Sequence, residues 1–446
     1  MQRRTGRSIL EISRKEVSLL AAACLLCMAL TAASRQAAPA PATQAATAAP
    51  AQQQLSDGVS YERKALRTPA GEPWSVHVLR VDRKAKQVQI RAASAAGEMR
   101  RELPTEIAKQ NVRAGEELLA VVNGDYDIAA PYLGVSDGVS ITSEHLWTTG
   151  KTTWPAMALR KNGEPLIAVP QMSMELRSTG VQWSIAAVNK PLGSVHAAGP
   201  RAYTRDFRTT VKSETPFRAI VVGKLSTTLP LRANQKVRGE VLEFHASVNE
   251  LAIPENAMVI AERIPGTSAP DVSRTTSRVP LFHLATFRAG EKVELRTNLR
   301  FAGRRDVRDV IGGFPIVAQG GKRGIVGEPG LNLRLRHPRT AVCYNAREII
   351  FVVVDGRQPH LSVGMTLEEL GDLMVSLGCT EAMNTDGGGS SVMALTMPHA
   401  AGATSLTAEV GAEAGRSKDR PLQIANSPSD GKERGRGNAW VIVRMK

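Results

Sequence analysis

The sequence lacks the short motifs that mark several common enzyme classes. Its 8 histidines show no paired metal-ligand spacing, which excludes a zinc-hydrolase pattern. Neither a Gly-x-Ser-x-Gly elbow nor a P-loop lysine pattern is present, so we do not expect Ser390 to be the nucleophile of a catalytic triad. Zinc-knuckle, cold-shock and ribonucleoprotein aromatic patterns are also missing, and Phe, Trp and Tyr make up only 4% of the chain. We therefore expect no nucleic-acid partner, although the formal net charge of +15 favours an anionic ligand such as a phosphorylated glycan.

Cysteine is scarce as well, and two of the 4 cysteines lie in a segment with the features of a targeting sequence. Basic residues between positions 3 and 15 precede an apolar stretch over residues 17–33 that ends in small residues, which is typical of a signal peptide. An uncleaved membrane anchor is the alternative, because the apolar stretch is close to the length that spans a bilayer. Only Cys343 and Cys379 lie beyond this segment. Export would permit a disulfide between them, but we expect two buried, unpaired side chains.

The composition divides the rest of the chain into three parts. Residues 34–55 are rich in Ala, Pro, Gln and Thr and are expected to form a flexible linker. Residues 56–119 form a strand-rich N-terminal segment, and residues 120–446 form the main domain. Within that domain, residues 172–310 are rich in strand signals and either complete the sheet or form a small β lobe. The predicted fold class is α+β, a single sheet-dominated catalytic domain with few helices, preceded by a signal or anchor segment and a flexible linker.

One helix is well marked in the sequence. Thr366 and Glu369 form a capping box, apolar residues recur at helical spacing as far as Leu377, and Gly378 follows as a stop. Strands are expected near residues 74–81, 88–91, 118–122, 156–159, 219–222, 236–244, 341–344, 348–354, 381–384 and 392–395.

The loop between the last two of these strands concentrates polar and glycine residues. It runs Asn-Thr-Asp-Gly-Gly-Gly-Ser-Ser over residues 384–391. Three consecutive glycines cost conformational entropy, which a plain hairpin turn does not require. A backbone that approaches a ligand closely, with N–H groups facing an anion, would justify that cost. We therefore favour a ligand-binding loop over a plain turn.

Three other segments place polar groups at strand ends. Val-Asp-Gly-Arg at residues 354–357 ends an apolar strand, where Asp355 and Arg357 either serve a site or form an ion pair that closes a turn. Arg339 precedes the strand near residues 341–344 and could bind phosphate in a bidentate manner, or be a surface charge. Asn-Gly-Asp-Tyr-Asp at residues 123–127 contains candidate acid/base or metal ligands, although taken alone it is more typical of a turn.

Taken together and in this order, these segments resemble the phosphodiester glycosidase family. Further matching segments are Ile-Gly-Gly-Phe-Pro at residues 311–315, His-Pro-Arg-Thr-Ala at 337–341, Gly-Met-Thr-Leu-Glu-Glu-Leu at 364–370, and Asn-Ser-Pro-Ser-Asp-Gly at 426–431 with Asn438 and Ala439. The resemblance runs from about residue 120 to the C-terminus and is dense after residue 312. Three features depart from the family pattern: Asp127 stands where relatives often carry an aromatic, Thr385 where Leu is usual, and residues 434–437 are unusually glycine-rich.

The resemblance implies hydrolysis of a sugar-1-phosphodiester at the glycosidic side. The implied catalytic residues are Asp386, as nucleophile or base, and Asp355, as a second acid/base or orienting group, although the two roles could be exchanged. The implied substrate- and phosphate-binding residues are Asn123, Gly124, Asp125, Arg339, Thr340, Arg357, Asn384, Gly387, Gly388, Gly389, Ser390 and Ser391. Arg339 and Arg357 would hold phosphate, because an anionic leaving group needs charge stabilisation more than protonation. Asn123 and Asp125 would contact the sugar or a metal, so no cofactor is certain and a divalent cation is possible.

Two other function classes remain open at this level. One is a secreted, non-catalytic module that binds a glycan or wall polymer through the same loop. The other is a divalent-metal phosphodiesterase that uses Asp125, Asp127 and Asp386. In each case the partner is an anionic glycan or sugar phosphodiester, and the expected location is the periplasm, the exterior or a membrane tether.

Overall fold

The computed structural model describes residues 52–151, 153–193, 199–264, 284–326, 334–396 and 421–446. The targeting segment and nearly all of the expected linker lie outside these residues. Among the residues that are described, no helix is both long enough and apolar enough to cross a membrane. The fold is dominated by sheet, with two α-helices in the described part, which confirms the predicted α+β class.

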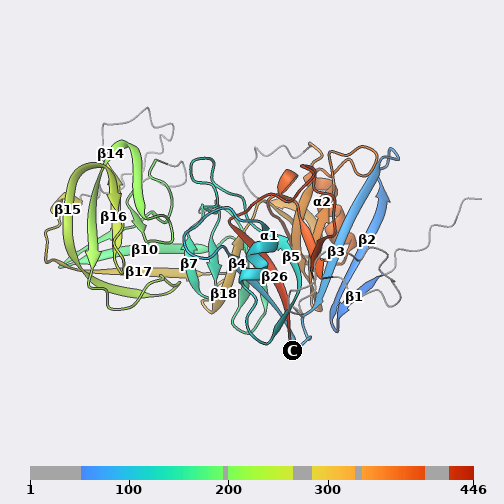
Figure 1. Cartoon of the computed structure of the whole chain (residues 1–446), viewed down its shortest axis with the longest axis horizontal. Helices are drawn as coiled ribbons and strands as arrows, with labels where there is room; N and C mark the ends of the chain where they lie inside the picture. The colour runs from blue at the N-terminus through green and yellow to red at the C-terminus, as the bar shows by residue number, and fades with distance from the viewer. Residues whose placement is uncertain (1–51, 152, 194–198, 265–283, 327–333, 397–420) are drawn as a thin grey trace, which may run out of the picture. The chain divides into compact units, whose positions relative to one another are not determined.

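Four sheets make up the described part of the chain. The first has 8 strands, in the order β1 (Gln53–Ser56), β2 (Val59–Arg67), β3 (Pro73–Asp82), β22 (Glu348–Val354), β21 (Arg339–Tyr344), β23 (Glu381–Asn384), β19 (Ile316–Gln319) and β20 (Lys322–Val326). The second has 5 strands, in the order β25 (Leu422–Ile424), β24 (Met393–Thr396), β5 (Glu116–Asn123), β26 (Asn438–Met445) and β4 (Val88–Ser94). The last three of these, β5, β26 and β4, can be followed in Figure 1.

The third sheet also has 5 strands, in the order β7 (His145–Thr148), β6 (Ser140–Thr142), β18 (Val307–Gly312), β8 (Ala156–Arg160) and β9 (Pro165–Ala168). The fourth has 8, in the order β11 (Val181–Ser184), β10 (Gln171–Ser178), β17 (Lys292–Arg300), β15 (Lys236–Ala252), β14 (Thr210–Gly223), β16 (Met258–Arg263), β13 (Arg201–Tyr203) and β12 (Ala187–Val188). The fourth sheet is built entirely from the stretch that the sequence left as either a completion of the main sheet or a β lobe, and it is a separate sheet.

The N-terminal strand-rich segment is part of the same sheets as the main domain. β3 pairs with β22, and β4 pairs with β26, each in antiparallel register. Strand β1 covers the last residues that the sequence assigned to the linker. One buried cluster joins the first three sheets, with members such as Leu79, Leu119, Ile311, Phe351 and Trp440. Burial of this apolar surface supplies the main driving force for packing the sheets together.

Two α-helices cover outer faces of the sheets. α2 (Leu367–Ser376) has the predicted capping box between Thr366 and Glu369, and Gly378 beyond its end adopts a φ of 86°. It packs against the first sheet through an apolar cluster that includes Leu370 and Met374. α1 (Pro104–Gln110) contacts β5 and β26, and the sequence pattern did not reveal it (Figure 1). Two short 3-10 helices, η1 (Leu284–Thr286) and η2 (Gly388–Ser390), complete the helical elements of the described residues.

The expectation of two unpaired cysteines is wrong. Cys343 on β21 and Cys379 just after α2 form a disulfide, with their Cα atoms 5.8 Å apart. The two residues meet because α2 packs against β19, β20 and β23 of the first sheet, and the chain beyond the helix continues into β23, which pairs with β21. The disulfide therefore links the helix to a central strand that begins at the predicted site.

Candidate functional site

Strand ends from the first two sheets meet at one place, and Asn123 joins them. Its side-chain Nδ2 donates to the carbonyl oxygen of Asp386 at 2.8 Å. Its Oδ1 accepts from the Thr340 hydroxyl at 2.9 Å and from the Val392 amide at 3.0 Å. Asn123 and Thr340 are both buried. These contacts bring four segments to the same place. They are the segment at the end of β5, the start of β21, the segment after β23 and the segment before β24.

Asp125 lies within the same region but is engaged by the protein. Its two carboxylate oxygens accept from the amides of Tyr126 at 2.8 Å and Gly138 at 2.7 Å, and the residue is 1% exposed. Burial raises the pKa of this carboxyl group, with a further contribution from the nearby Asp137. Its neighbour Gly124 must be glycine, since a Cβ there would lie 2.0 Å from the side-chain oxygen of Asn438. The arrangement fixes the turn, and contact of Asp125 with a sugar or metal stays a prediction.

Asp386 is the carboxylate that leads the glycine-rich loop, and it is paired with a buried arginine. The Nη1 atom of Arg436 lies 2.6 Å from its Oδ2 and 3.4 Å from the Oδ2 of Asp127. Burial raises the pKa of Asp386 to about 6, against the lowering effects of Arg436 and of a hydrogen bond from Ser390, while Asp127 raises it further. A carboxyl group with a pKa near 6 changes its charge close to neutral pH, as acid/base groups do in active sites. Arg436 was not among the predicted site residues.

Asp355 is more enclosed than Asp386. Its Oδ2 lies 2.8 Å from Nε2 of His77, and its Oδ1 accepts from the Ser427 amide at 2.8 Å and from Asn426 Nδ2 at 3.3 Å. Burial acts to raise the pKa of Asp355, but the contacts with His77 and Ser427 outweigh it and leave the pKa lowered. His77 in turn lies 2.8 Å from the hydroxyl of Tyr61. With both carboxylate oxygens engaged and a side chain only 1% exposed, Asp355 suits an orienting role better than direct contact with a substrate.

The two predicted phosphate-binding arginines have no carboxylate partner among the described residues. Arg339 is buried, and its guanidinium donates to the carbonyls of Met365 at 2.8 Å and Leu335 at 3.0 Å. Arg357 is exposed, has a φ of 59°, and places Nη2 3.3 Å from Nδ1 of His337. A buried guanidinium without a counter-charge is costly unless an anion completes the site.

The glycine-rich loop packs closely against the strand end that carries Arg339. The Gly388 amide donates to the Pro338 carbonyl at 2.8 Å, and the Gly388 φ is 63°. A Cβ at Gly387 would lie 2.8 Å from the same Pro338 oxygen, and one at Gly388 would lie 3.1 Å from the Arg357 guanidinium. The glycines are therefore required because neighbouring parts of the protein approach the loop closely. The amides of Gly388, Ser390 and Ser391 already donate within the protein, whereas those of Gly387 and Gly389 donate to none of the described residues.

Asn384 and Tyr126 line the side of the site beside Asp386. Asn384 Nδ2 donates to the Tyr126 hydroxyl at 2.8 Å and to the Phe314 carbonyl at 2.7 Å. Burial raises the pKa of Tyr126, and the next largest contribution comes from Asp386. The Asn384 side-chain oxygen and the Ser391 hydroxyl are buried with no hydrogen-bond partner in the described part of the chain. Unsatisfied buried polar atoms are costly, and two of them on one loop are typical of a site that a ligand completes.

The described residues contain no group of three or more His, Cys, Asp or Glu side chains arranged to hold a metal ion. In particular, Asp127 and Asp386 both face Arg436, and Asp125 is bound by backbone amides, so the three carboxylates proposed as a metal site are engaged elsewhere.

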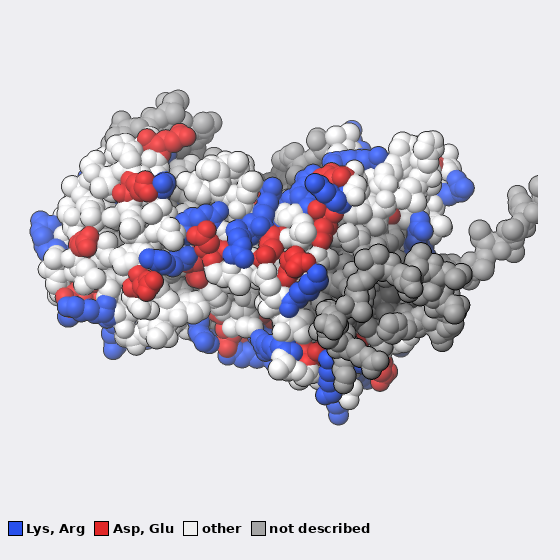
Figure 2. Space-filling model, in the orientation of Figure 1, with Lys and Arg blue, Asp and Glu red and all other residues white. Residues whose placement is uncertain are grey.

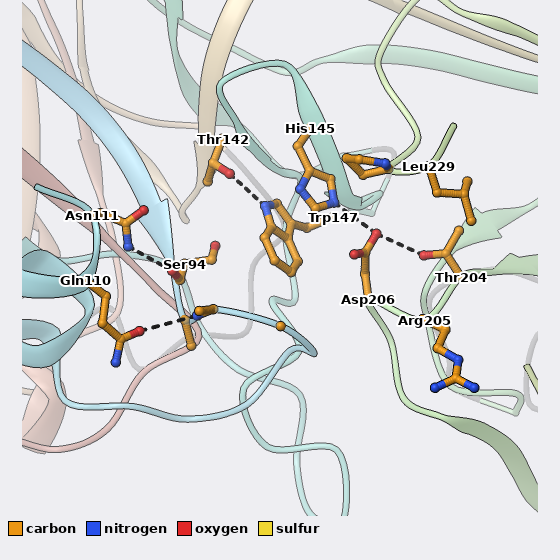
Figure 3. A pocket seen from close by; sticks show the side chains of 14 residues that line it. Ser94, Gln110, Asn111, Thr142, His145, Trp147, Thr204, Arg205, Asp206 and Leu229 are labelled. Atoms are coloured by element: carbon orange, nitrogen blue, oxygen red, sulfur yellow. Dashed lines mark hydrogen bonds and ion pairs between the residues drawn. The ribbon is translucent and has the colours of Figure 1, made fainter. Parts of the chain in front are cut away.

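A separate pocket of about 460 Å³ contains none of the predicted site residues (Figure 3). Its walls include a stacked pair, with the rings of His145 and Trp147 4.0 Å apart, and an ion pair between His145 and Asp206 at 2.9 Å. On the face seen in Figure 2, acidic and basic side chains are interleaved, so no patch of a single charge marks a site there. The net charge of +15 is therefore no guide to the ligand on that face.

Residues 234–443 match the sequence model of a family described as phosphodiester glycosidase. The matched region contains Arg339, Asp355, Arg357, Asp386 and the glycine-rich loop, while the Asn123 segment lies outside it. No curated protein matches the chain.

Two solved structures share the fold, and a third gives a lower score. A hypothetical protein from Synechocystis superposes with a TM-score of 0.64 at 14% identity, over 88% of this chain and 63% of that one. An exported protein, described as putative, from Burkholderia pseudomallei gives 0.59 at 19% identity, over 84% and 75% of the two chains. The catalytic domain of zebrafish N-acetylglucosamine-1-phosphodiester alpha-N-acetylglucosaminidase gives 0.38 at 13% identity, over 87% and 82%. The chain thus spans less than two thirds of the Synechocystis protein, and at these identities the likeness shows the fold alone. In its sequence, the region from residue 234 to residue 443 is thus similar to the phosphodiester glycosidase family.

Proposed function

We propose that the protein is an exported hydrolase that cleaves a sugar-1-phosphodiester at the glycosidic bond, in the metabolism of exopolysaccharide or cell-envelope glycans. One observation carries the proposal. A buried carboxylate, Asp386, with a pKa of about 6, lies on the same loop cluster as Arg339 and Arg357, which have no carboxylate partner among the described residues. When a glycosyl phosphodiester is hydrolysed, positive charge develops on the sugar and the leaving phosphate carries negative charge. A carboxylate can stabilise the first charge, and arginines without carboxylate partners can stabilise the second.

In the proposed reaction the bond between the anomeric carbon and the phosphate oxygen breaks. Water supplies the new oxygen on the sugar, and the second product is a phosphate monoester. Positive charge develops on the sugar in the transition state, and an ionised Asp386 stabilises it. Asp386 either attacks the anomeric carbon, and water then hydrolyses the intermediate, or removes a proton from the attacking water.

The leaving phosphate is already anionic, so its stabilisation depends on fixed positive charge and N–H donors. The guanidinium groups of Arg339 and Arg357 supply the charge. The amides of Gly387 and Gly389, which donate to none of the described residues, can donate to the same oxygens. Asp355 acts through the protein, since it holds the segment at Asn426 and Ser427 in place.

The test offers the protein a panel of α-glycosyl 1-phosphate methyl diesters and measures the reducing sugar that hydrolysis releases. Asp386→Asn should lower turnover by at least about 1000-fold, the scale of a lost acid/base group, while the protein stays folded. Asp372→Asn, which changes an exposed carboxylate on α2 paired with Arg323, is the matched control and should retain full turnover. Retained turnover in folded Asp386→Asn would refute the assignment. Absence of turnover in the wild type across the panel would instead favour a non-catalytic glycan-binding module.

Export is supported by the basic and apolar N-terminal segment together with the disulfide between Cys343 and Cys379, since disulfides persist in oxidising compartments. Cell fractionation, combined with thiol labelling of the recovered protein, tests this part. Recovery of the chain in the cytoplasm with both thiols free would contradict it.

A further inference from the structure

Two of the features in which this chain departs from its family pattern lie in direct contact. Arg436 comes from the glycine-rich stretch before β26, and Asp127 stands where relatives often carry an aromatic. The Nη1 atom of Arg436 lies 3.4 Å from Asp127 Oδ2 and 2.6 Å from Asp386 Oδ2. The side chains of Arg436, Asp127 and Asp386 are 3%, 1% and 12% exposed, so all three are largely buried. No sequence pattern connects positions 127 and 436, which are more than 300 residues apart.

The contacts form a row of alternating charges. Arg101 Nε lies 2.6 Å from Asp127 Oδ2, and the Gly437 amide donates to Asp127 Oδ1 at 3.2 Å. Asp127 is therefore held from two sides and gives Arg436 a counter-charge that does not depend on Asp386. Burying ions together is tolerable only when they are paired. This row pairs each charge, while the Nε of Arg436 is buried with no hydrogen-bond partner among the described residues.

We propose that Arg436, held by Asp127, is the positioning residue of Asp386 in this protein. It fixes one carboxylate oxygen of Asp386, keeps the group ionised in a buried place and so orients the carboxylate toward the sugar or the attacking water. The proposal rests on the function proposed above for Asp386 and concerns residues that are not themselves in contact with the substrate.

The electrostatics of the site agree with this geometry. The charged and titratable groups that face Asp386 are Arg434 and Arg436 from the loop before β26, and Tyr126 and Asp127 from the loop after β5. Burial is the largest effect and raises the pKa of Asp386 to about 6. Arg436 is the strongest opposing group, and Asp127 acts in the opposite direction to Arg436. The two neighbours of Asp386 should therefore shift its ionisation in opposite directions when each is neutralised.

The experiment compares the wild type with Arg436→Met, Arg436→Lys and Asp127→Asn. The matched control is Arg444→Met, which removes an arginine of β26 that pairs with Glu117, away from Asp386. Two quantities are measured for each folded variant. One is the pH dependence of kcat/KM on the best diester of the panel. The other is the pH dependence of carbodiimide labelling of Asp386, read by peptide mass spectrometry, which needs no activity.

The expected midpoint for the wild type lies near pH 6 in both measurements. Arg436→Met should move it upward by roughly one pH unit or more, since an opposite charge in contact shifts a carboxyl pKa by about that amount. Asp127→Asn should move it downward, Arg436→Lys should restore most of the wild-type value, and Arg444→Met should leave it unchanged. A residue with a merely structural role would lower activity without moving either midpoint.

Unchanged midpoints, or midpoints that move in the same direction in Arg436→Met and Asp127→Asn, would overturn the proposal. Where Arg436→Met does not fold, the downward shift of the midpoint in Asp127→Asn and a midpoint close to the wild-type value in Arg436→Lys decide it. Labelling that shifts as expected in a protein without hydrolytic activity would uphold the role of Arg436 and refute the proposed function. Hydrolysis without the labelling shifts would support the proposed function and refute the role of Arg436.

Discussion

Removing the positive charge of Arg339 should weaken binding of phosphate far more than binding of sugar. The guanidinium donates to two backbone carbonyls, and its other N–H groups have no partner among the described residues. A charge-assisted hydrogen bond to an anion contributes about 1.5 to 3 kcal/mol, and a bidentate pair lies at the upper end or above it. We expect Arg339→Met to cost about 3 kcal/mol of transition-state stabilisation, which corresponds to a loss of roughly 100-fold in kcat/KM.

The assay for this prediction has two arms. The first is kcat/KM on a glycosyl 1-phosphate methyl diester. The second is calorimetric titration of inorganic phosphate and, separately, of the free sugar product. Phosphate affinity should fall together with kcat/KM, whereas sugar affinity should change by less than about twofold. Arg323→Met is the control, because Arg323 is an exposed arginine whose single described ion pair is with Asp372 at 3.1 Å.

The reasoning would be refuted if phosphate bound the folded Arg339→Met protein as tightly as the wild type. It would also be refuted if phosphate and sugar lost affinity equally, since Arg339 would then shape the site as a whole. Thermal unfolding of the variant identifies the folded fraction, because the lost hydrogen bonds to Met365 and Leu335 also lower stability.

Two further predictions concern stability. Replacing Cys343 and Cys379 together with Ala should lower the free energy of unfolding by about 4 kcal/mol, from the loop entropy of a 36-residue separation; a loss below about 1 kcal/mol in denaturant titration would argue against a disulfide in the isolated protein. Asp355→Asn should cost roughly 2 to 4 kcal/mol at pH 7, since it weakens a buried contact with His77. The folded-state pKa of Asp355 lies below its unfolded value, so this stabilisation is complete above the unfolded pKa, near 4, and is lost as pH falls through the folded pKa. A stability difference between the two proteins that persisted unchanged to pH 2 would contradict this assignment.

Local sequence rules predicted the elements that carry local signals. The capping box at Thr366 and Glu369 and the stop at Gly378 placed α2 to within one residue. β22 and β23 have the predicted bounds, because short apolar runs there end at polar or glycine residues. α1 was missed because it is only 7 residues long and its N-cap residue, Leu103, makes no side-chain cap.

The residues that the sequence missed are those whose partners lie far along the chain. His77 meets Asp355 across 278 positions, and Arg436 meets Asp386 across 50. No short pattern encodes such a pairing, which arises only once β3 lies beside β22 and the loop before β26 lies over the glycine-rich loop. The disulfide belongs to the same class, since it depends on how the chain after α2 pairs with β21 through β23. The signal that did exist for Arg436 was the unusual glycine content around it.

The proposed chemistry itself is tested most directly by hydrolysis in water enriched in oxygen-18. Attack at the anomeric carbon places the label on the released sugar, and the phosphate monoester remains unlabelled. Mass spectrometry of the two products from a glycosyl 1-phosphate methyl diester distinguishes the outcomes. Our account predicts label in the sugar alone. Label in the phosphate would show attack at phosphorus and would contradict cleavage at the glycosidic bond.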